Sequence, residues 1–257
     1  MRHLIIGAGT VGFSTGKWLE ANNEEVYFND ISAEKIKNLK EQGHKVANNI
    51  QTVKDVDITW ICVAEWNVED VVKLLGTLAM GYVVIRSTTA PGTVEELRRT
   101  YGLLEVAHNP EFLRADTAIE DTFFPDRIII GSESSELIKV LKSLYDPMKV
   151  PIFVTDSTTS ELIKLASNCW LATQISYWAE ILKLCGKYGV NPQAVSYGCT
   201  LDKRISKYGS KLIGEPFEKF CLPKDIATMQ NLFESKKITS KFLKMIVDKN
   251  EEVKNEG

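Results

Sequence analysis

A lysine and an asparagine stand four residues apart in a long helical pattern, so both side chains lie on one face of that helix. They are Lys164 and Asn168, and Glu161 lies one turn earlier on the same face. A cation and an amide in this arrangement can hold a substrate hydroxyl and stabilise the oxyanion that forms when a hydride leaves. The same spacing also suits a solvated helix face, so the pattern alone leaves both interpretations open.

A cysteine near the carboxyl end offers a nucleophile. Cys221 begins the string CLPKD, in which the proline predicts a helix start at Lys224 and Asp225. The positive end of that helix and Lys224 would favour the thiolate of Cys221. A thiolate beside a hydride acceptor can convert an aldehyde to a thiohemiacetal, then to a thioester that water releases as an acid. Asp225 or Glu111 can activate that water, whereas the alternative for Cys221 is a buried, inert packing residue.

Polar residues that directly follow strands are further candidates. Ser87 and Thr88 follow an apolar run at residues 82–85, and Glu111 comes after Asn109 and Pro110. In an open α/β sheet the ligand lies beyond the carboxyl ends of the strands. Serine, threonine, asparagine and proline are also common turn residues, so a purely structural role stays open. A carboxylate between an Asn-Pro pair and an apolar pair is poorly explained by solvation.

Three glycines have the G-x-G-x-x-G spacing that binds dinucleotides. Gly7, Gly9 and Gly12 lie between an apolar run at residues 4–6 and a helical pattern at residues 11–19. Asp30 ends the next apolar run, where a dinucleotide fold places the acid that accepts the ribose hydroxyls. An acid there repels a 2′-phosphate, which favours NAD over NADP; an ordinary strand–turn–helix is the alternative. The residues expected to line the cofactor are Gly7, Gly9, Thr10, Val11, Gly12, Asp30, Lys35, Val63, Ser87 and Thr88.

The composition is that of an ordinary globular protein that acts on small molecules. Hydrophobic residues make up 44% and charged residues 25% of the 257 residues, and the net charge of −3 gives no general attraction to nucleic acid or anionic membranes. No apolar run approaches a membrane span and the chain enters a strand directly, so we expect a cytoplasmic protein. The five cysteines include no C-x-x-C pair, so neither a disulfide framework nor a metal site is expected. Four of them are expected to pack in the interior: Cys62, Cys169, Cys185 and Cys199.

Strand and helix patterns alternate as far as residue 154, which predicts an α/β fold with a doubly wound, mostly parallel sheet of the Rossmann type. One helical pattern then runs from Ser157 to Tyr188 and is followed by helices only. We therefore expect a dinucleotide-binding domain at residues 1–156 and a helical domain at residues 157–257. Helices are expected to begin at Glu133 and at Asp225, and the charged tail at 249–257 is expected to fray.

Five strings occur along the chain in a characteristic order: NPEFLR at 109–114, PDR at 125–127, ELIK at 161–164 with Asn168, DKRI at 202–205 and CLPKD at 221–225. With these strings, the chain resembles the UDP-glucose/GDP-mannose dehydrogenase family over nearly its whole length. The resemblance implies oxidation of the primary alcohol of a nucleotide sugar to a uronic acid, with two NAD⁺ and a thioester intermediate.

Residue roles follow from the resemblance by matching position. Cys221 corresponds to the nucleophile, Lys164 and Asn168 to the groups that stabilise the oxyanion, and Thr88 and Asp225 to those that hold the hydrolytic water. Glu111 matches a glutamate of general acid/base chemistry. The long helix resembles the family's dimer spine, which implies a homodimer. Substrate contacts are implied for Phe112, Leu113, Arg114, Lys164, Asn168 and Arg204, the last of these across the dimer.

The sequence also departs from the family pattern. Family members usually continue into a second Rossmann-like domain that binds the nucleotide, whereas this chain ends at Gly257. Residues 215–220 replace the glycines usual before the cysteine, and Ala115 replaces a second glutamate. The chain is therefore expected to be a reduced or split enzyme with a separate nucleotide-binding chain, or a member that acts on a different substrate. The alternatives are a two-electron β-hydroxyacid dehydrogenase and a catalytically inactive NAD-binding partner subunit.

Overall fold

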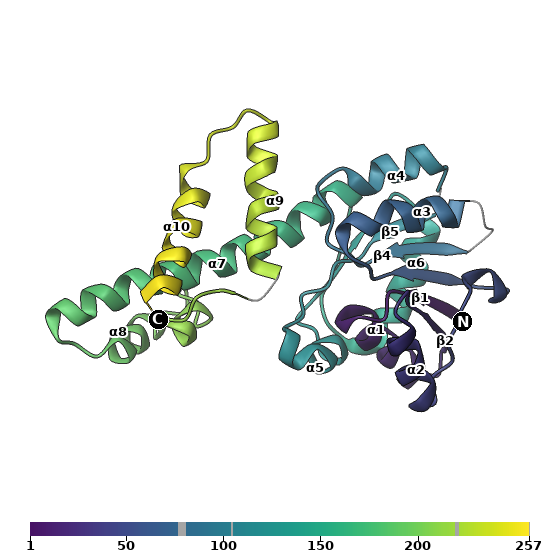
Figure 1. Cartoon of the computed structure of the whole chain (residues 1–257), viewed down its shortest axis with the longest axis horizontal. Coiled ribbons are helices and arrows are strands. Elements are labelled where there is room, and N and C mark those ends of the chain that lie inside the picture. The colour runs from purple at the N-terminus through teal and green to yellow at the C-terminus, as the bar shows by residue number, and fades with distance from the viewer. Residues whose placement is uncertain (77–80, 104, 219–220, 257) are drawn as a thin grey trace. The chain divides into compact units, whose positions relative to one another are not determined.

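The computed structural model describes residues 1–76, 81–103, 105–218 and 221–256. The chain divides into two compact units, Met1–Lys164 and Leu165–Gly257. The first unit combines a β-sheet with helices, and the second is helical (Figure 1).

Seven strands form one sheet in the first unit. Their order is β2-β1-β3-β4-β5-β6-β7, and every neighbouring pair is parallel except β5 and β6. This arrangement confirms the predicted mostly parallel, Rossmann-type sheet. The strands are β1 (Arg2–Ile6), β2 (Glu25–Asn29), β3 (Ile58–Ile61), β4 (Tyr82–Ile85), β5 (Val106–His108), β6 (Ile128–Gly131) and β7 (Ile152–Thr155).

Helices cover both faces of the sheet. Along β4, Val84 packs in one buried cluster with residues of α1 and α6, while Val83 and Ile85 pack in another with residues of α3 and α4. Because successive strand side chains point to opposite faces, the two clusters are the two faces of the sheet. The helices are α1 (Thr10–Ala21), α2 (Ala33–Glu41), α3 (Val68–Gly76), α4 (Thr93–Tyr101), α5 (Ala118–Phe123) and α6 (Ser135–Tyr145), with short 3₁₀ turns η1 (Ile50–Thr52), η2 (Glu65–Asn67), η3 (Ala115–Thr117) and η4 (Asp146–Met148).

Serine caps fix two helix starts. Ser32 caps α2 by accepting a hydrogen bond from the Lys35 backbone N–H. Ser134 caps α6 in the same way, through a 3.1 Å bond from Leu137 N–H. The predicted start at Glu133 was therefore wrong, because the serine one residue later is the side chain that caps the helix.

The long helix α7 (Ser157–Tyr188) has the predicted bounds, and its first two turns belong to the first unit. The rest of α7 forms the second unit together with α8 (Pro192–Thr200), η5 (Gly209–Leu212), α9 (Cys221–Ser235) and α10 (Lys241–Glu256). Their buried cluster includes Leu165 and Ala172 of α7, Ile226 of α9 and Ile246 of α10.

The structure corrects two predictions in the second unit. Helix α9 begins at Cys221 and not at Asp225, because Pro223 falls in its first turn, where the missing N–H costs no intrahelical bond. The charged tail is helical to Glu256. Buried Asn250 anchors it, and Lys249 pairs with Glu180 of α7 at 2.5 Å and with Glu252 one turn away.

No helix among the described residues has the length and apolar character that a membrane crossing requires.

Buried His3 makes the stability of the first unit sensitive to acid. Its Nδ1 accepts a 3.0 Å hydrogen bond from the Trp60 indole, and burial lowers the pKa of His3 to about 4. In the unfolded chain a histidine titrates near pH ~6.5. Between these values the unfolded state binds the extra proton, so we predict that His3 alone lowers the free energy of unfolding by about 3 kcal/mol as the pH drops from 6.5 to 4.

Thermal unfolding followed by tryptophan fluorescence across this pH range measures the loss. His3→Gln is expected to reduce the slope without abolishing it, because burial also lowers the pKa of His108 to about 3. If stability falls equally steeply with pH in His3→Gln and in the unchanged chain, His3 is not a source of the acid sensitivity.

Candidate active site

The glycine loop between β1 and α1 has the shape that a bound pyrophosphate requires. A Cβ atom on Gly7 would lie 2.5 Å from the Cys62 carbonyl oxygen, and one on Gly12 would lie 1.8 Å from the Gly7 oxygen. A Cβ on Gly9 would meet nothing within 4 Å, and within the described chain no side chain caps α1. Tight packing therefore explains Gly7 and Gly12, whereas Gly9 and the first N–H groups of α1 face open space where phosphates can bind.

Asp30 lies next to this loop, as the sequence predicts. Its carboxylate accepts 2.8 Å hydrogen bonds from the backbone N–H groups of Ala8 and Ser32, and Lys35 Nζ lies 3.2 Å away. Burial acts to raise the pKa of Asp30, but these hydrogen bonds outweigh it and hold the pKa below its usual value. The residue is thus a fixed anion joined to the glycine loop, suited to accept ribose hydroxyls.

The ends of β3 and β4 meet at the same edge of the sheet. The Ser87 hydroxyl donates a 2.7 Å hydrogen bond to the Val63 carbonyl, and Thr88 follows in a partly exposed position. Cys62 lies beneath Gly12, and burial raises the pKa of its thiol to about 12. Val63, Ser87 and Thr88 therefore lie together, and Cys62 is the packing residue that the sequence suggests.

Lys164 and Glu111, identified by separate arguments in the sequence, are in direct contact. Lys164 Nζ donates to the Glu111 carbonyl oxygen at 2.6 Å and pairs with its carboxylate at 3.0 Å. The side chains are only 4% and 10% exposed. The other Glu111 oxygen accepts the Leu113 N–H at 2.7 Å. A buried, hydrogen-bonded ion pair thereby joins the start of α7 to the segment that follows β5.

The Phe112 ring contacts two cations. The Arg127 guanidinium is 3.9 Å from the centre of its ring, and Lys164 Nζ is 5.3 Å from it. Arg114 pairs with Asp121 through its guanidinium and remains largely exposed. Of the residues predicted to touch substrate in this stretch, Phe112 and Leu113 lie beside Lys164 and Glu111, and Arg114 lies at the surface.

A buried polar network beneath Glu111 was missed by the sequence reasoning. Arg86 Nη1 donates to Asn109 Oδ1 at 2.6 Å and to the Tyr145 hydroxyl at 3.0 Å. Asn109 Nδ2 in turn donates to the Ile129 carbonyl at 2.6 Å. The network fixes the residues just before Glu111. The signal in the sequence is a charged residue, Arg86, directly after the apolar strand β4.

In the second unit, Asn168 of α7 contacts Asp225 of α9. Asn168 Nδ2 donates to Asp225 Oδ2 at 2.6 Å, and the carboxylate is only 1% exposed. Lys224 Nζ forms an ion pair with Oδ1 at 2.6 Å. Cys221 is exposed on the first turn of α9, four residues before Asp225 and hence on the same face. The amide, the acid and the thiol of the predicted chemistry thus lie on two packed helices.

The other cysteines of this unit differ from Cys221. Burial, with the Asp225 carboxylate, raises the pKa of Cys169 to about 12, and Cys185 is also buried. Both serve packing as predicted. Cys199 is exposed, so its predicted packing role was wrong, because it lies on the outer face of the short helix α8.

The segment before Cys221 is anchored by a residue that the sequence reasoning assigned to a frayed tail. Asn250 of α10 accepts the Phe217 N–H at 2.8 Å and donates to the Phe217 carbonyl at 3.2 Å. The Phe217 side chain packs in the buried cluster of the unit. Arg204 lies elsewhere on the surface, with its side chain 89% exposed and paired with Asp202.

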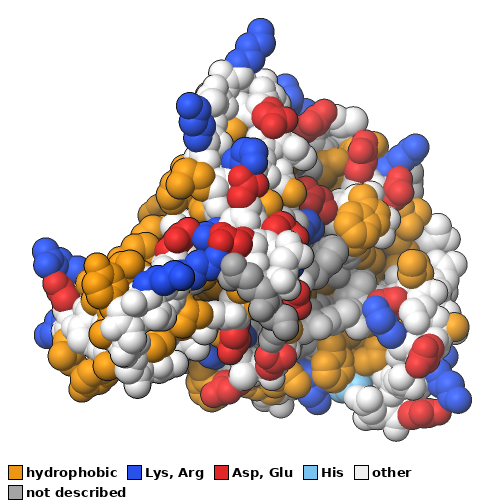
Figure 2. Space-filling model, turned by 60° about the vertical axis from the view of Figure 1, so that its left-hand side comes forward, with side chains coloured by type: hydrophobic (Ala, Val, Ile, Leu, Met, Phe, Trp, Pro, Cys, Tyr) orange, Lys and Arg blue, Asp and Glu red, His pale blue; other side chains and the backbone are white. Residues whose placement is uncertain are grey.

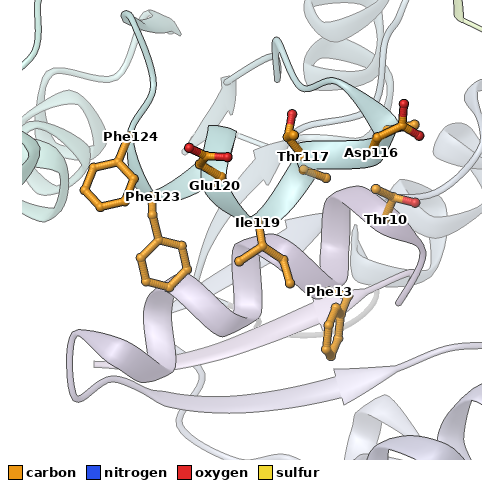
Figure 3. A pocket seen from close by; sticks show the side chains of 10 residues that line it. Thr10, Phe13, Asp116, Thr117, Ile119, Glu120, Phe123 and Phe124 are labelled. Carbon is orange, nitrogen blue, oxygen red and sulfur yellow. The ribbon is translucent and has the colours of Figure 1, made fainter.

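A hollow of about 690 Å³ lies beside the amino end of α1 (Figure 3). Thr10 and Phe13 of α1 line one side, and residues of η3 and α5, among them Ile119 and Phe123, line the other. The lining of the hollow is largely apolar. The hollow therefore lies next to the predicted phosphate position but lacks the polar groups that bind phosphate. Across the described residues no cluster of three or more His, Cys, Asp or Glu side chains could hold a metal ion.

The geometry around Asp30 predicts how the cofactor is chosen. Asp30→Asn removes the negative charge while keeping the size of the side chain, so we expect about tenfold weaker binding of NAD⁺ and little or no loss for NADP⁺. Calorimetric titration of both cofactors measures the change, and Glu34→Gln, at an exposed position on α2, is the matched control. Equal losses for the two cofactors would show that Asp30 does not face the ribose.

Two models of one family match most of the chain. The model described as the UDP-glucose/GDP-mannose dehydrogenase family, NAD binding domain, matches residues 43–149, and the central domain of the same family matches residues 158–252. The first match supports the prediction that the cofactor is NAD.

Curated relatives and a solved structure agree with these matches. The UDP-glucose 6-dehydrogenase of Rickettsia typhi is 41% identical over 175 residues, which cover 65% of this chain and 40% of the relative. UDP-glucose 6-dehydrogenase YwqF of Bacillus subtilis is 30% identical over 97% of this chain and 66% of its own length. The structure of a UDP-glucose dehydrogenase from Pyrobaculum islandicum superposes with a TM-score of 0.89 at 27% identity, covering 97% of this chain and 68% of that one.

The chain therefore spans between about 40% and two thirds of the length of these relatives. The matched domains are consecutive. The first begins after the glycine loop and includes Ser87, Thr88 and Glu111, and the second includes nearly all of α7 and Cys221. On these matches, the chain belongs to the UDP-glucose/GDP-mannose dehydrogenase family.

Proposed function

We propose that the chain oxidises the primary alcohol of a nucleotide sugar to a uronic acid, with UDP-glucose as the first substrate to test. The observation that carries the proposal is a pair of buried contacts on successive turns of α7. Lys164 contacts Glu111, and Asn168 contacts Asp225, so each candidate oxyanion-stabilising group is held by a candidate acid or base. A solvated helix face would show neither contact, because its side chains would be exposed.

In this proposal Lys164 and Asn168 hold the substrate oxygen. When NAD⁺ is bound it accepts the hydride, and the alcohol loses its proton to Glu111, directly or through water. The ammonium of Lys164 and the amide of Asn168 then stabilise the negative charge that develops on the oxygen. Their burial strengthens this effect, because the local dielectric is low.

Cys221 supplies the covalent step. Its thiolate adds to the aldehyde carbon, and the aldehyde oxygen takes up a proton to give a thiohemiacetal. Loss of a hydride to a second NAD⁺, together with loss of that proton, would leave a thioester. The position of Cys221 on the first turn of α9 favours the thiolate, since the amino end of a helix is positive. Asp225 and Thr88 position the water that attacks the thioester, which breaks the C–S bond and releases the acid and the thiol.

Substrate contacts and assembly belong to the same proposal. Phe112, Leu113 and Arg114 bind the sugar, and Arg204 reaches a substrate held by a second copy of the chain. A homodimer through α7 is supported by Trp170, Tyr177 and Leu184, which are 61%, 58% and 54% exposed and recur every seven residues on one face. Figure 2 shows hydrophobic side chains gathered on the surface of the second unit.

The stoichiometry of NADH distinguishes this proposal from its alternatives. We expect two NADH per substrate consumed, and Cys221→Ser should slow uronic acid formation by about a thousandfold or more, because a nucleophile is removed. Spectrophotometry of NADH with chromatography of the sugar product makes the measurement. Cys199→Ser changes another exposed cysteine of the same unit and should leave the rate unaltered.

One NADH per substrate, insensitive to Cys221→Ser, would identify a two-electron β-hydroxyacid dehydrogenase. NAD⁺ binding without turnover of any nucleotide sugar, alone or with a candidate nucleotide-binding chain, would identify an inactive partner subunit.

A further inference from the structure

Glu161 is a buried carboxylate in the first turns of α7. Its exposed fraction is 0%, yet the three groups that donate hydrogen bonds to it are all uncharged. Burial raises the pKa of Glu161, the Asp156 carboxylate adds to the rise, and the hydrogen bonds oppose it. The neighbouring cation, Lys164, is directed to Glu111. Among the described residues no cation pairs with Glu161, and burying such a carboxylate is costly for folding. We therefore ask what its hydrogen bonds hold in place.

All three donors come from the segment between β4 and α4. The Thr89 hydroxyl and the Val94 N–H donate to Oε1 at 2.8 and 3.0 Å, and the Gly92 N–H donates to Oε2 at 2.7 Å. Gly92 is the N-cap residue of α4 and has no side chain to cap it. Glu161 therefore supplies the helix cap from another element, with its charge at the positive end of α4.

These hydrogen bonds also restrict Thr88, which lies between the segment that Glu161 holds and the end of β4. Ser87 is tied to the Val63 carbonyl at 2.7 Å, and Thr89 is tied to Glu161. Thr88 lies between these two anchored neighbours. Lys164 lies one turn after Glu161 on the same helix. The first turns of α7 therefore fix the positions of both Thr88 and Lys164.

We propose that Glu161 is a positioning residue for the proposed reaction: through Thr89 and Gly92 it holds Thr88 in register with Lys164. This role rests on the proposed function, in which Thr88 orients the water that attacks the thioester. Glu161 itself does not touch the substrate. It sets the distance between the water-holding loop and the helix that carries the oxyanion-stabilising lysine.

Glu161→Gln tests the role with little change in side-chain volume. The amide can keep one acceptor oxygen toward Thr89 and Val94, but its NH₂ group then faces the Gly92 N–H, a donor opposite a donor. We expect hydrogen exchange at the Gly92 amide to become about tenfold faster, as loss of one net hydrogen bond implies. With UDP-glucose, kcat should fall about 10- to 100-fold while the Kd for NAD⁺ stays within about twofold.

Controls separate positioning from general stability. Glu136→Gln neutralises an exposed carboxylate on α6 and should change neither amide exchange nor kcat. Thr89→Val removes one donor and leaves the carboxylate, so it should give a smaller loss of kcat in the same direction. It also serves as the test if Glu161→Gln does not fold.

Two results would overturn the proposal: an unaltered kcat in both variants, or a fall in NAD⁺ affinity as large as the fall in kcat. Failure of the proposed function is recognised separately, because the unchanged chain would then form no uronic acid. In that case amide exchange still tests the structural part of the proposal. If the Gly92 amide exchanges at the same rate in Glu161→Gln as in the unchanged chain, Glu161 does not hold the loop between β4 and α4.

Discussion

The buried ion pair between Lys164 and Glu111 is the contact on which the candidate site depends. Two charges removed from water are stable only when further hydrogen bonds satisfy them, and here the Glu111 carbonyl and the Leu113 N–H do so. Loss of either partner would leave an uncompensated buried charge, at a cost of roughly 3–5 kcal/mol. The beginning of α7, which carries Glu161 and Lys164, is therefore fixed beside the end of β5.

Other contacts of the first turns of α7 act in the same direction. Ser160 contacts the buried His108 ring at 2.9 Å, and Glu161 caps α4. Asp30 and the glycine loop are connected independently, through the Ala8 N–H. The first unit thus presents a glycine loop and the candidate catalytic residues on one sheet, each held by its own polar contacts. In the second unit, Asn250 holds the segment before Cys221 through both polar atoms of the Phe217 backbone.

The sequence predicted those features that depend on residues close together in the chain. The glycine spacing, Asp30 after its strand and the bounds of α7 are all encoded within a few residues, and the structure agrees with each. The predicted fraying of the tail failed because tertiary contacts of Asn250 and Lys249 outweigh the high charge of that segment. The network of Arg86 and Tyr145 joins residues 59 apart in the sequence, and no local pattern reports such a contact.

The central claim is that a carbon of the substrate becomes bonded to Cys221 during turnover. UDP-glucose labelled with ¹³C at its C6 position, mixed with NAD⁺ and the chain and then quenched in acid, tests it by peptide mass spectrometry. We predict labelled carbon on the peptide that contains Cys221 and none on the peptide that contains Cys199. Formation of NADH and uronic acid with no label on Cys221 at any quench time would contradict it.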